Sequence, residues 1–279
     1  MRISERHGAR TSGPQDGPPM VFAHGFGCDQ SMWRWVAPQF ESDHRVVLFD
    51  HAGAGDADPT LYDPRRHATL EGYASDVIAL LDDLALPPVV FVGHSVSAMI
   101  GLLAAVRRPD LFDRMVLVCP SPRYIDDDGY RGGFAPEEID ELLSTMDANY
   151  LGWSRAMAPV ITGNPERPEI GQELAAAFCR TDPEIARHFA RTTFLSDNRA
   201  DLAAVRTPSL VVQSRQDAIA PPEVGRYVHD HLQGSTLTVV DAVGHCPNLS
   251  APAVLVAAIR SYLAQDEEES AALEEQPVA

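Results

Sequence analysis

The feature that most constrains the fold is an apolar run that turns into a helix within five residues. Residues 89–92 read Val-Val-Phe-Val, Gly93-His-Ser-Val-Ser97 follows, and an apolar, small-residue stretch then continues to Pro109. This pattern predicts a buried strand, a tight turn and a helix packed on a sheet. In the related pattern Gly-x-Ser-x-Gly the serine takes a strained conformation that exposes its hydroxyl. We therefore expect Ser95 to be a nucleophile, although an N-cap serine in an ordinary strand-to-helix turn is the alternative.

Two later residues complete the order serine, aspartate, histidine. Asp217 follows the apolar run 209–213, and His245 follows the strand-like run 236–240. The carboxyl ends of parallel strands meet at one edge of a sheet, so we expect both side chains to lie close to Ser95. The sequence thus predicts a catalytic triad of Ser95, Asp217 and His245, in which the histidine is the base and the aspartate orients it.

A second glycine-rich turn lies near the start of the chain. Residues 20–27 read Met-Val-Phe-Ala-His-Gly-Phe-Gly, a strand that breaks at glycines. In folds with a nucleophile turn of this kind, one oxyanion-hole amide comes from such a loop and the other from the residue after the nucleophile. The predicted oxyanion donors are therefore the backbone N–H groups of Phe26 and Val96. Taken alone, the loop could be an ordinary glycine turn.

Strand-like runs alternate with mostly helical patterns along the chain, at residues 19–24, 45–50, 88–92, 114–119, 208–213 and 235–240. This alternation predicts an α/β fold with a mostly parallel, doubly wound sheet. The rhythm stops between the fourth and fifth runs, where the pattern indicates helices at residues 136–150, 152–161, 169–180 and 183–196. We predict a core of residues 1–120 and 202–264, a helical cap of residues 121–201, and an acidic, disordered tail over residues 265–279.

Composition excludes several classes of partner. Forty acidic and 22 basic residues give a net charge of −18, which argues against nucleic acid and against an anionic membrane surface. No lysine is present, so Schiff-base and P-loop chemistry are excluded. Residues 1–19 contain no apolar signal-peptide region, and the four cysteines show no C-x-x-C spacing. We expect a reduced, cytoplasmic protein, with no membrane span.

Longer motifs resemble a known family. Residues 24–33, 93–101, 121–124 and 194–197 are similar to those of RsbQ-type α/β hydrolases, a group that includes a bacterial stress-pathway regulator and plant karrikin and strigolactone receptors. The likeness extends from about residue 8 to residue 252. The resemblance implies an α/β-hydrolase fold with a four-helix cap over an apolar pocket, and small ester or butenolide-like ligands. It also implies pocket walls formed by Phe26, Tyr124, Phe134, Trp153 and Phe194.

Two functions of different classes fit these residues. The first is an enzyme that hydrolyses a small apolar ester or lactone through an acyl-enzyme on Ser95. The second is a signalling component that senses its ligand by slow hydrolysis and then binds a protein partner through its cap. A cofactor-free perhydrolase or a carbon–carbon bond hydrolase is a weaker alternative, because both use the same triad. None of these needs a metal or an organic cofactor, and an arginine-rich chain without lysine suggests a bacterial source.

Overall fold

The computed structural model describes residues 1–274, and only the backbone of residues 266–274. Its centre is a seven-stranded sheet in the order β1-β3-β2-β4-β5-β6-β7. The strands are β1 (Arg10–Ser12), β2 (Pro19–Ala23), β3 (Arg45–Leu48), β4 (Val89–His94), β5 (Phe112–Val118), β6 (Ser209–Gln216) and β7 (Ser235–Val243). All neighbouring pairs are parallel except β1 with β3. The predicted mostly parallel sheet is confirmed.

Side chains of alternate strand residues enter two separate cores. Val21 and Phe91 belong to the core that also holds α2 (Leu70–Leu84) and α3 (Val96–Arg107). Phe22 and Val92, one residue further along each strand, belong to the core that holds α10 (Pro252–Glu274). Successive side chains of a strand point to opposite faces, so helices cover the sheet on both sides, as expected for a doubly wound fold. The strand β1 was not predicted, because its three polar residues carry no apolar pattern.

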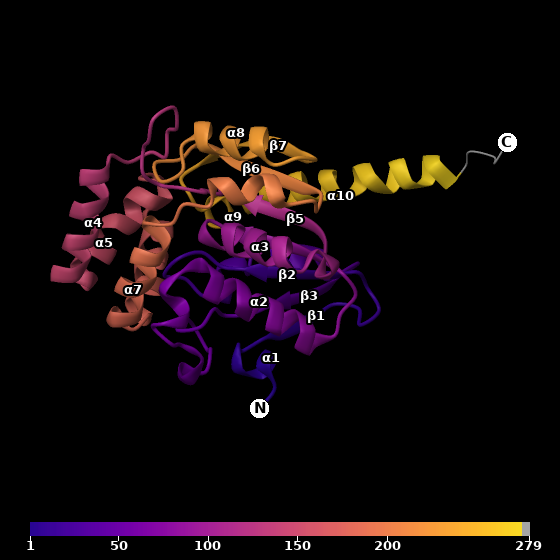
Figure 1. Ribbon diagram of the computed structural model, residues 1–279, viewed down its shortest axis with the longest axis horizontal. Helices are drawn as coiled ribbons and strands as arrows, with labels where there is room; N and C mark the ends of the chain where they lie inside the picture. The colour runs from indigo at the N-terminus through magenta and orange to yellow at the C-terminus, as the bar shows by residue number, and fades with distance from the viewer. Residues whose placement is uncertain (275–279) are drawn as a thin grey trace.

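Four helices lie between β5 and β6 along the chain: α4 (Pro136–Ala148), α5 (Tyr150–Thr162), α6 (Pro168–Arg180) and α7 (Pro183–Phe194). We call them the cap helices. Figure 1 shows α4, α5 and α7 grouped at one end of the molecule, with α10 projecting at the opposite end. A proline in the first turn begins three of them, where its missing N–H costs nothing. They match the four predicted helical segments, while the exact boundaries 121 and 201 stay a prediction.

The remaining α-helices are α1 (Ile3–Arg6), α8 (Pro222–His231) and α9 (Pro247–Ser250). Turns of 3₁₀ helix lie at Gln30–Trp33, Ala37–Phe40, Pro59–Leu61, Arg66–Ala68, Pro109–Leu111 and Arg199–Ala204. Helix α10 extends to Glu274, so it overlaps the stretch 265–279 for which the sequence predicts disorder. That disorder stays a prediction, since residues 275–279 lie outside the described residues.

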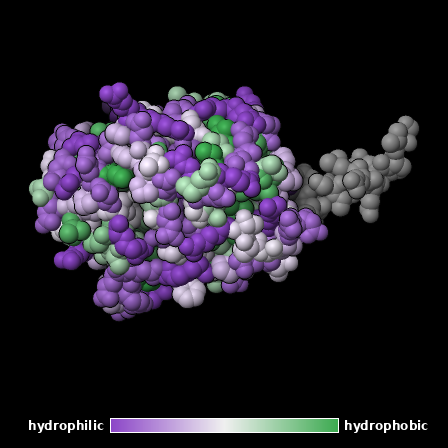
Figure 2. Space-filling model, turned by 90° about the horizontal axis from the view of Figure 1, so that it is seen from below, coloured by the Kyte–Doolittle hydropathy of each residue, from purple (hydrophilic) through white to green (hydrophobic). Residues whose placement is uncertain are grey.

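Hydrophilic side chains cover most of the face shown in Figure 2, and hydrophobic ones form small separate groups between them. This surface agrees with the strongly acidic composition. Across the part of the chain that the structure describes, no helix combines the length and the apolar character needed to cross a membrane.

Candidate active site

The turn between β4 and α3 holds Ser95 in a strained conformation, with φ 57° and ψ −124°. A side chain at position 93 would not fit, because a Cβ on Gly93 would lie 2.6 Å from the Ser97 carbonyl oxygen. Ser97 stands where the usual pattern has glycine, and its hydroxyl donates a hydrogen bond to the His24 carbonyl. It also lies 2.7 Å from His51 Nε2. The departure from the usual pattern therefore ties the turn to the glycine-rich loop after β2.

The three residues of the predicted triad form one hydrogen-bonded chain. His245 Nε2 lies 2.7 Å from Ser95 Oγ, and His245 Nδ1 lies 2.8 Å from Asp217 Oδ2. Asp217 follows β6 and His245 follows β7, so the ends of neighbouring strands bring them together. Since a carboxylate only accepts, Nδ1 carries the proton and Nε2 is left to accept from the serine hydroxyl.

Asp217 is buried but well supplied with donors. Its second oxygen, Oδ1, accepts from the N–H groups of Ile219 and Ala220, at 2.8 and 3.0 Å. Burial by itself would raise the pKa of this carboxyl, but His245 and the two amides outweigh that effect and hold the pKa below its ordinary value. Asp217 is therefore ionised at neutral pH and can stabilise an imidazolium.

His94, the last residue of β4, supports the backbone of the triad histidine. Its Nε2 lies 2.7 Å from the His245 carbonyl oxygen, which must accept, so Nε2 carries the proton. Burial lowers the pKa of His94 to about 3. The ring is therefore neutral at physiological pH and acts as a hydrogen-bond donor that fixes the loop.

The predicted oxyanion donors lie at the two places that the sequence indicated. Phe26 is in the loop after β2, and Val96 is the first residue of α3. Among the described residues, no acceptor pairs with the N–H of either one. The N-terminus of a helix also favours negative charge. Both N–H groups are thus available to a ligand, and their role stays a prediction.

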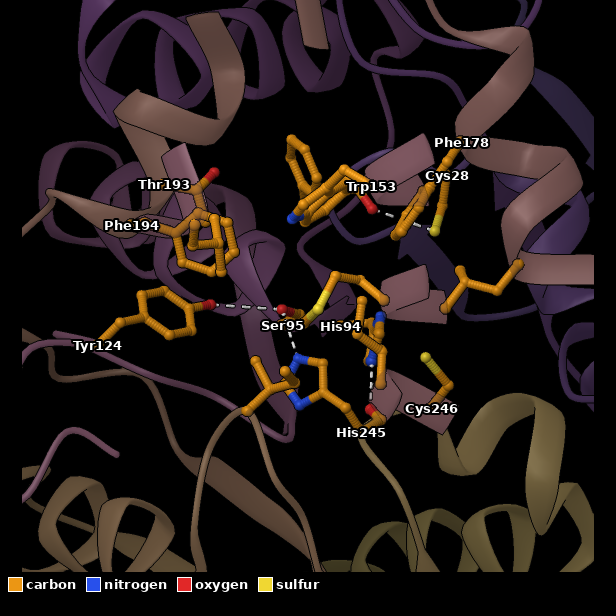
Figure 3. A pocket seen from close by; sticks show the side chains of 16 residues that line it. Cys28, His94, Ser95, Tyr124, Trp153, Phe178, Thr193, Phe194, His245 and Cys246 are labelled. Atoms are coloured by element: carbon orange, nitrogen blue, oxygen red, sulfur yellow. Dashed lines mark hydrogen bonds between the residues drawn. The ribbon is translucent and has the colours of Figure 1, made fainter. Parts of the chain in front are cut away.

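A small cavity of about 40 Å³ opens beside Ser95 (Figure 3). The cap helices supply Leu142, Trp153, Met157, Ile161, Leu174, Phe178, Thr193 and Phe194, and the rest of its wall is Phe26, Cys28, His94, Ser95, Tyr124, Ile219, His245 and Cys246. Four of the five residues expected from the resemblance line it. The Tyr124 hydroxyl lies 3.4 Å from Ser95 Oγ, and burial raises the pKa of Tyr124 to about 12.

The expectation for Phe134 is not met, because this residue is not part of the cavity wall. Its backbone pairs with the chain on either side of Ile125: the Phe134 N–H donates to Tyr124, and its carbonyl accepts from Asp126. This pairing holds the half-buried Phe134 outside the cavity while Tyr124 enters it.

Phe178 is the largest residue of the cavity wall that was not predicted from the sequence. Its ring lies 5.8 Å from the ring of Phe26 and 5.6 Å from that of Trp153. A usable signal did exist on α5, where Trp153, Met157 and Ile161 recur every four residues and share one helix face. For Phe178 on α6 the same periodicity shows an apolar face, but not what that face covers.

One group of the described residues could in principle bind a metal: potential ligand atoms of Cys119, Asp217 and His245 lie within 4.8 Å of one another. However, Asp217 and His245 are already paired with each other. Burial raises the pKa of the Cys119 thiol well above its ordinary value, which disfavours the thiolate that a metal needs. The donor set fits a triad better than a metal site.

A serine at a strained strand-to-helix turn, paired with a histidine and an aspartate from later strand ends of a doubly wound sheet, defines an α/β-fold hydrolase. Residues 20–258 match the alpha/beta hydrolase family, and the chain belongs to that family.

Individual relatives cover nearly the whole chain. It is 41% identical to a protein of Oryza sativa subsp. japonica that is named a probable esterase, over 95% of this chain and 98% of that one. It is 39% identical to "Karrikin insensitive 2 receptor IA" of Petunia hybrida, over 88% of this chain and 90% of the other. The solved structure of a hydrolase from Oleispira antarctica superposes with a TM-score of 0.91 at 36% identity, covering 93% of this chain and 95% of that one. These relatives support the predicted resemblance to the group of hydrolases that includes plant karrikin and strigolactone receptors.

Proposed function

We propose that the protein hydrolyses a small, largely apolar ester or lactone, with Ser95 as nucleophile, His245 as general base and Asp217 as the group that orients it. The observation that carries this proposal is the chain of hydrogen bonds from Asp217 through His245 to Ser95, which ends at an apolar cavity. The relative named as a probable esterase supports it.

In this mechanism Ser95 Oγ attacks the carbonyl carbon of the ligand while its proton moves to His245 Nε2. The N–H groups of Phe26 and Val96 hold the oxyanion, each contributing about 3 kcal/mol. The C–O bond to the alcohol then breaks, and His245 returns the proton to the alcohol oxygen. Water, activated by His245, releases the acyl group and restores Ser95. In a lactone the alcohol stays attached to the acyl group throughout, so the last step releases a single hydroxy acid.

The cavity wall indicates the chemistry of the ligand. It is mostly apolar, yet Trp153 Nε1 and Thr193 Oγ1 are buried there and have no hydrogen-bond partner among the described residues. Unpaired buried polar atoms are costly unless a ligand satisfies them. A compact molecule with one ester or lactone group and a further oxygen acceptor fits this wall, and a butenolide is one example.

A sensing role is the second candidate. The Petunia relative is named as a receptor, and in this chain a cap helix reaches the triad, because the Ile161 carbonyl accepts a hydrogen bond from the His245 N–H. In that case hydrolysis would be slow and the cap would bind a protein partner.

The likeness to the RsbQ-type group also leads us to propose a cytoplasmic location and a bacterial origin for this protein. A perhydrolase or a carbon–carbon bond hydrolase, the weaker alternative, would use the same triad on different substrates.

The test compares the wild type with Ser95→Ala on a fluorogenic butenolide and on p-nitrophenyl acetate, followed by intact-mass analysis. We expect kcat to fall by about 10⁵-fold. Ser42→Ala, at an exposed serine remote from the cavity, should retain full activity. If Ser95→Ala keeps its rate, the proposal is wrong. Sustained turnover by the wild type supports a hydrolase, and a single burst with a lasting adduct supports sensing.

A further inference from the structure

One cap helix contacts both the cavity and the backbone of the triad histidine. Side chains of α5 line the cavity at Trp153, Met157 and Ile161. At the C-terminal end of the same helix, the Ile161 carbonyl oxygen accepts a hydrogen bond of 2.8 Å from the His245 N–H. The position of α5 therefore bears directly on the position of His245.

The contact at this end of α5 is one of backbone against backbone. Gly244, just before the histidine, has φ +88°, and a Cβ there would lie 1.8 Å from the Thr162 carbonyl oxygen. No side chain fits between the loop and the helix. The loop is also joined to the end of β6, because the Gly244 N–H donates to the carbonyl of Gln216, the residue before Asp217, at 2.8 Å.

The side chain of Asn164 makes a further link across this contact. Asn164 lies two residues after the end of α5, beyond Gly163, which adopts the left-handed conformation. Its Nδ2 donates to the Val243 carbonyl at 2.8 Å and also to the Thr162 carbonyl. Its Oδ1 accepts from Arg167 at 3.2 Å. One amide thus joins the last residue of α5 to the last residue of β7, two positions before His245.

We propose that Asn164 is a positioning residue that links α5 to the loop carrying His245. Through this link, which we call the clasp, His245 keeps its hydrogen-bonding distance to Ser95 only while α5 is in place. This inference rests on the proposed hydrolysis and adds a means by which the cap controls it. Misplacing a catalytic group by 1 Å can cost about 100-fold in rate. Asn164 is only half-buried, so water replaces part of what its loss removes, and the expected effect is about tenfold.

Two substitutions separate the donated hydrogen bonds from simple packing. Asn164→Asp keeps the size of the side chain and the acceptor for Arg167, but it loses both N–H donors. Asn164→Ala loses everything. If the donors matter, both variants lower kcat on p-nitrophenyl acetate about tenfold, with KM changed less than about twofold. If Asn164 only fills space, Asn164→Asp keeps the wild-type kcat, and the proposal is overturned.

Asn149→Ala is the matched control, because it changes the same residue type at the opposite end of α5. There Asn149 Oδ1 accepts from the Gly152 N–H at 2.9 Å and caps the helix. This control should lower the Tm, as loss of an N-cap does, and leave kcat unchanged. An equal loss of kcat in Asn149→Ala and Asn164→Ala would show that general loosening of α5 explains the effect, and would contradict the clasp.

A fluorophosphonate gives a second measurement that does not depend on the natural ligand. Ser95 Oγ attacks phosphorus, fluoride leaves, and the serine proton passes to His245, so the labelling rate followed by intact mass reports on the attack by Ser95 without a later acyl-release step. We expect labelling to slow about tenfold in both Asn164 variants. Folding is checked by circular dichroism. A Ser95→Ala variant that still hydrolyses esters refutes the proposed function itself, whereas an inactive Ser95→Ala beside fully active Asn164 variants refutes only the clasp.

Discussion

The cavity has a floor, formed by the loops that carry the triad, His94 and Phe26, and a roof, formed by the cap helices. Different interactions stabilise the two. On the floor, hydrogen bonds hold the triad: His245 lies between Ser95 and Asp217, and His94 donates to the His245 carbonyl. The roof, made of the cap helices, is mainly aromatic and aliphatic. Apart from the hydrogen bonds at the end of α5, the roof meets the floor in a cluster of rings around Phe26, which packs against Trp153, Phe178, Phe189 and Phe194.

The roof is also held to the rest of the protein by partly exposed ion pairs, Arg34 with Glu173 and Arg180 with Asp29. Such pairs contribute only about 0 to 1 kcal/mol each. Directional hydrogen bonds on the floor fix single atoms, whereas the non-directional contacts of the roof fix a shape. We therefore expect changes on the floor to alter the chemical step, and changes in the apolar wall of the roof, away from the end of α5, to alter which ligand is accepted.

The largest effect should follow from a change on the floor that leaves the roof intact. Asp217→Asn preserves shape but offers His245 an amide, which favours the wrong tautomer of the imidazole. In comparable triads this lowers kcat about 10⁴-fold. The kcat and KM for p-nitrophenyl acetate measure it. Asp241→Asn, at an exposed aspartate paired with Arg215, is the matched control. A comparable loss in both variants would contradict the special role of Asp217.

The same division explains which parts of the molecule could be predicted from the sequence. Strand ends of a parallel sheet converge, so the order of Ser95, Asp217 and His245 along the chain was enough to place all three together. The strained backbone at Ser95 also followed from the local pattern, and the structure shows it.

The roof was predicted less completely. Helix periodicity gave the four cap helices and their apolar faces, but the rotation of each helix over the cavity depends on packing between distant segments. Phe134 was assigned to the wall and lies outside it, while Phe178 was not assigned and lies inside. The bond between the Ile161 carbonyl and the His245 N–H joins two backbones, and no side-chain pattern reports such a contact.

An intermediate effect, on stability, should also belong to the floor. The pKa of His94 is lowered by burial to about 3, against about 6.5 in an unfolded chain. As the pH falls below 6.5, the unfolded chain takes up a proton that the folded protein refuses. The contribution of this histidine to stability is therefore complete above pH 6.5, and it declines by about 1.4 kcal/mol per pH unit towards pH 3.

His94→Gln keeps a donor for the His245 carbonyl and removes the titration. Urea unfolding between pH 6 and pH 4 should show a shallower loss of stability in this variant than in the wild type, whereas His231→Gln, at an exposed histidine on α8, should follow the wild type. Identical slopes in all three proteins would show that His94 is not a source of the acid sensitivity, and would weaken the contrast between a titratable floor and an apolar roof.

The smallest effect should come from the roof and should change selectivity. Phe178→Leu shortens a buried side chain of the cavity wall, which leaves room for a longer acyl chain. A difference of one or two methylenes in an apolar pocket is worth about 1 to 3 kcal/mol. We expect the ratio of kcat/KM for p-nitrophenyl butyrate over the acetate to rise about tenfold, with an unchanged rate of fluorophosphonate labelling at Ser95. Phe112→Leu, a similar loss in the core beside Phe91, should lower the Tm without changing the ratio. If Phe178→Leu instead slows labelling as much as ester hydrolysis, the roof sets the geometry of Ser95 and His245 as well as the ligand, and floor and roof act as one unit.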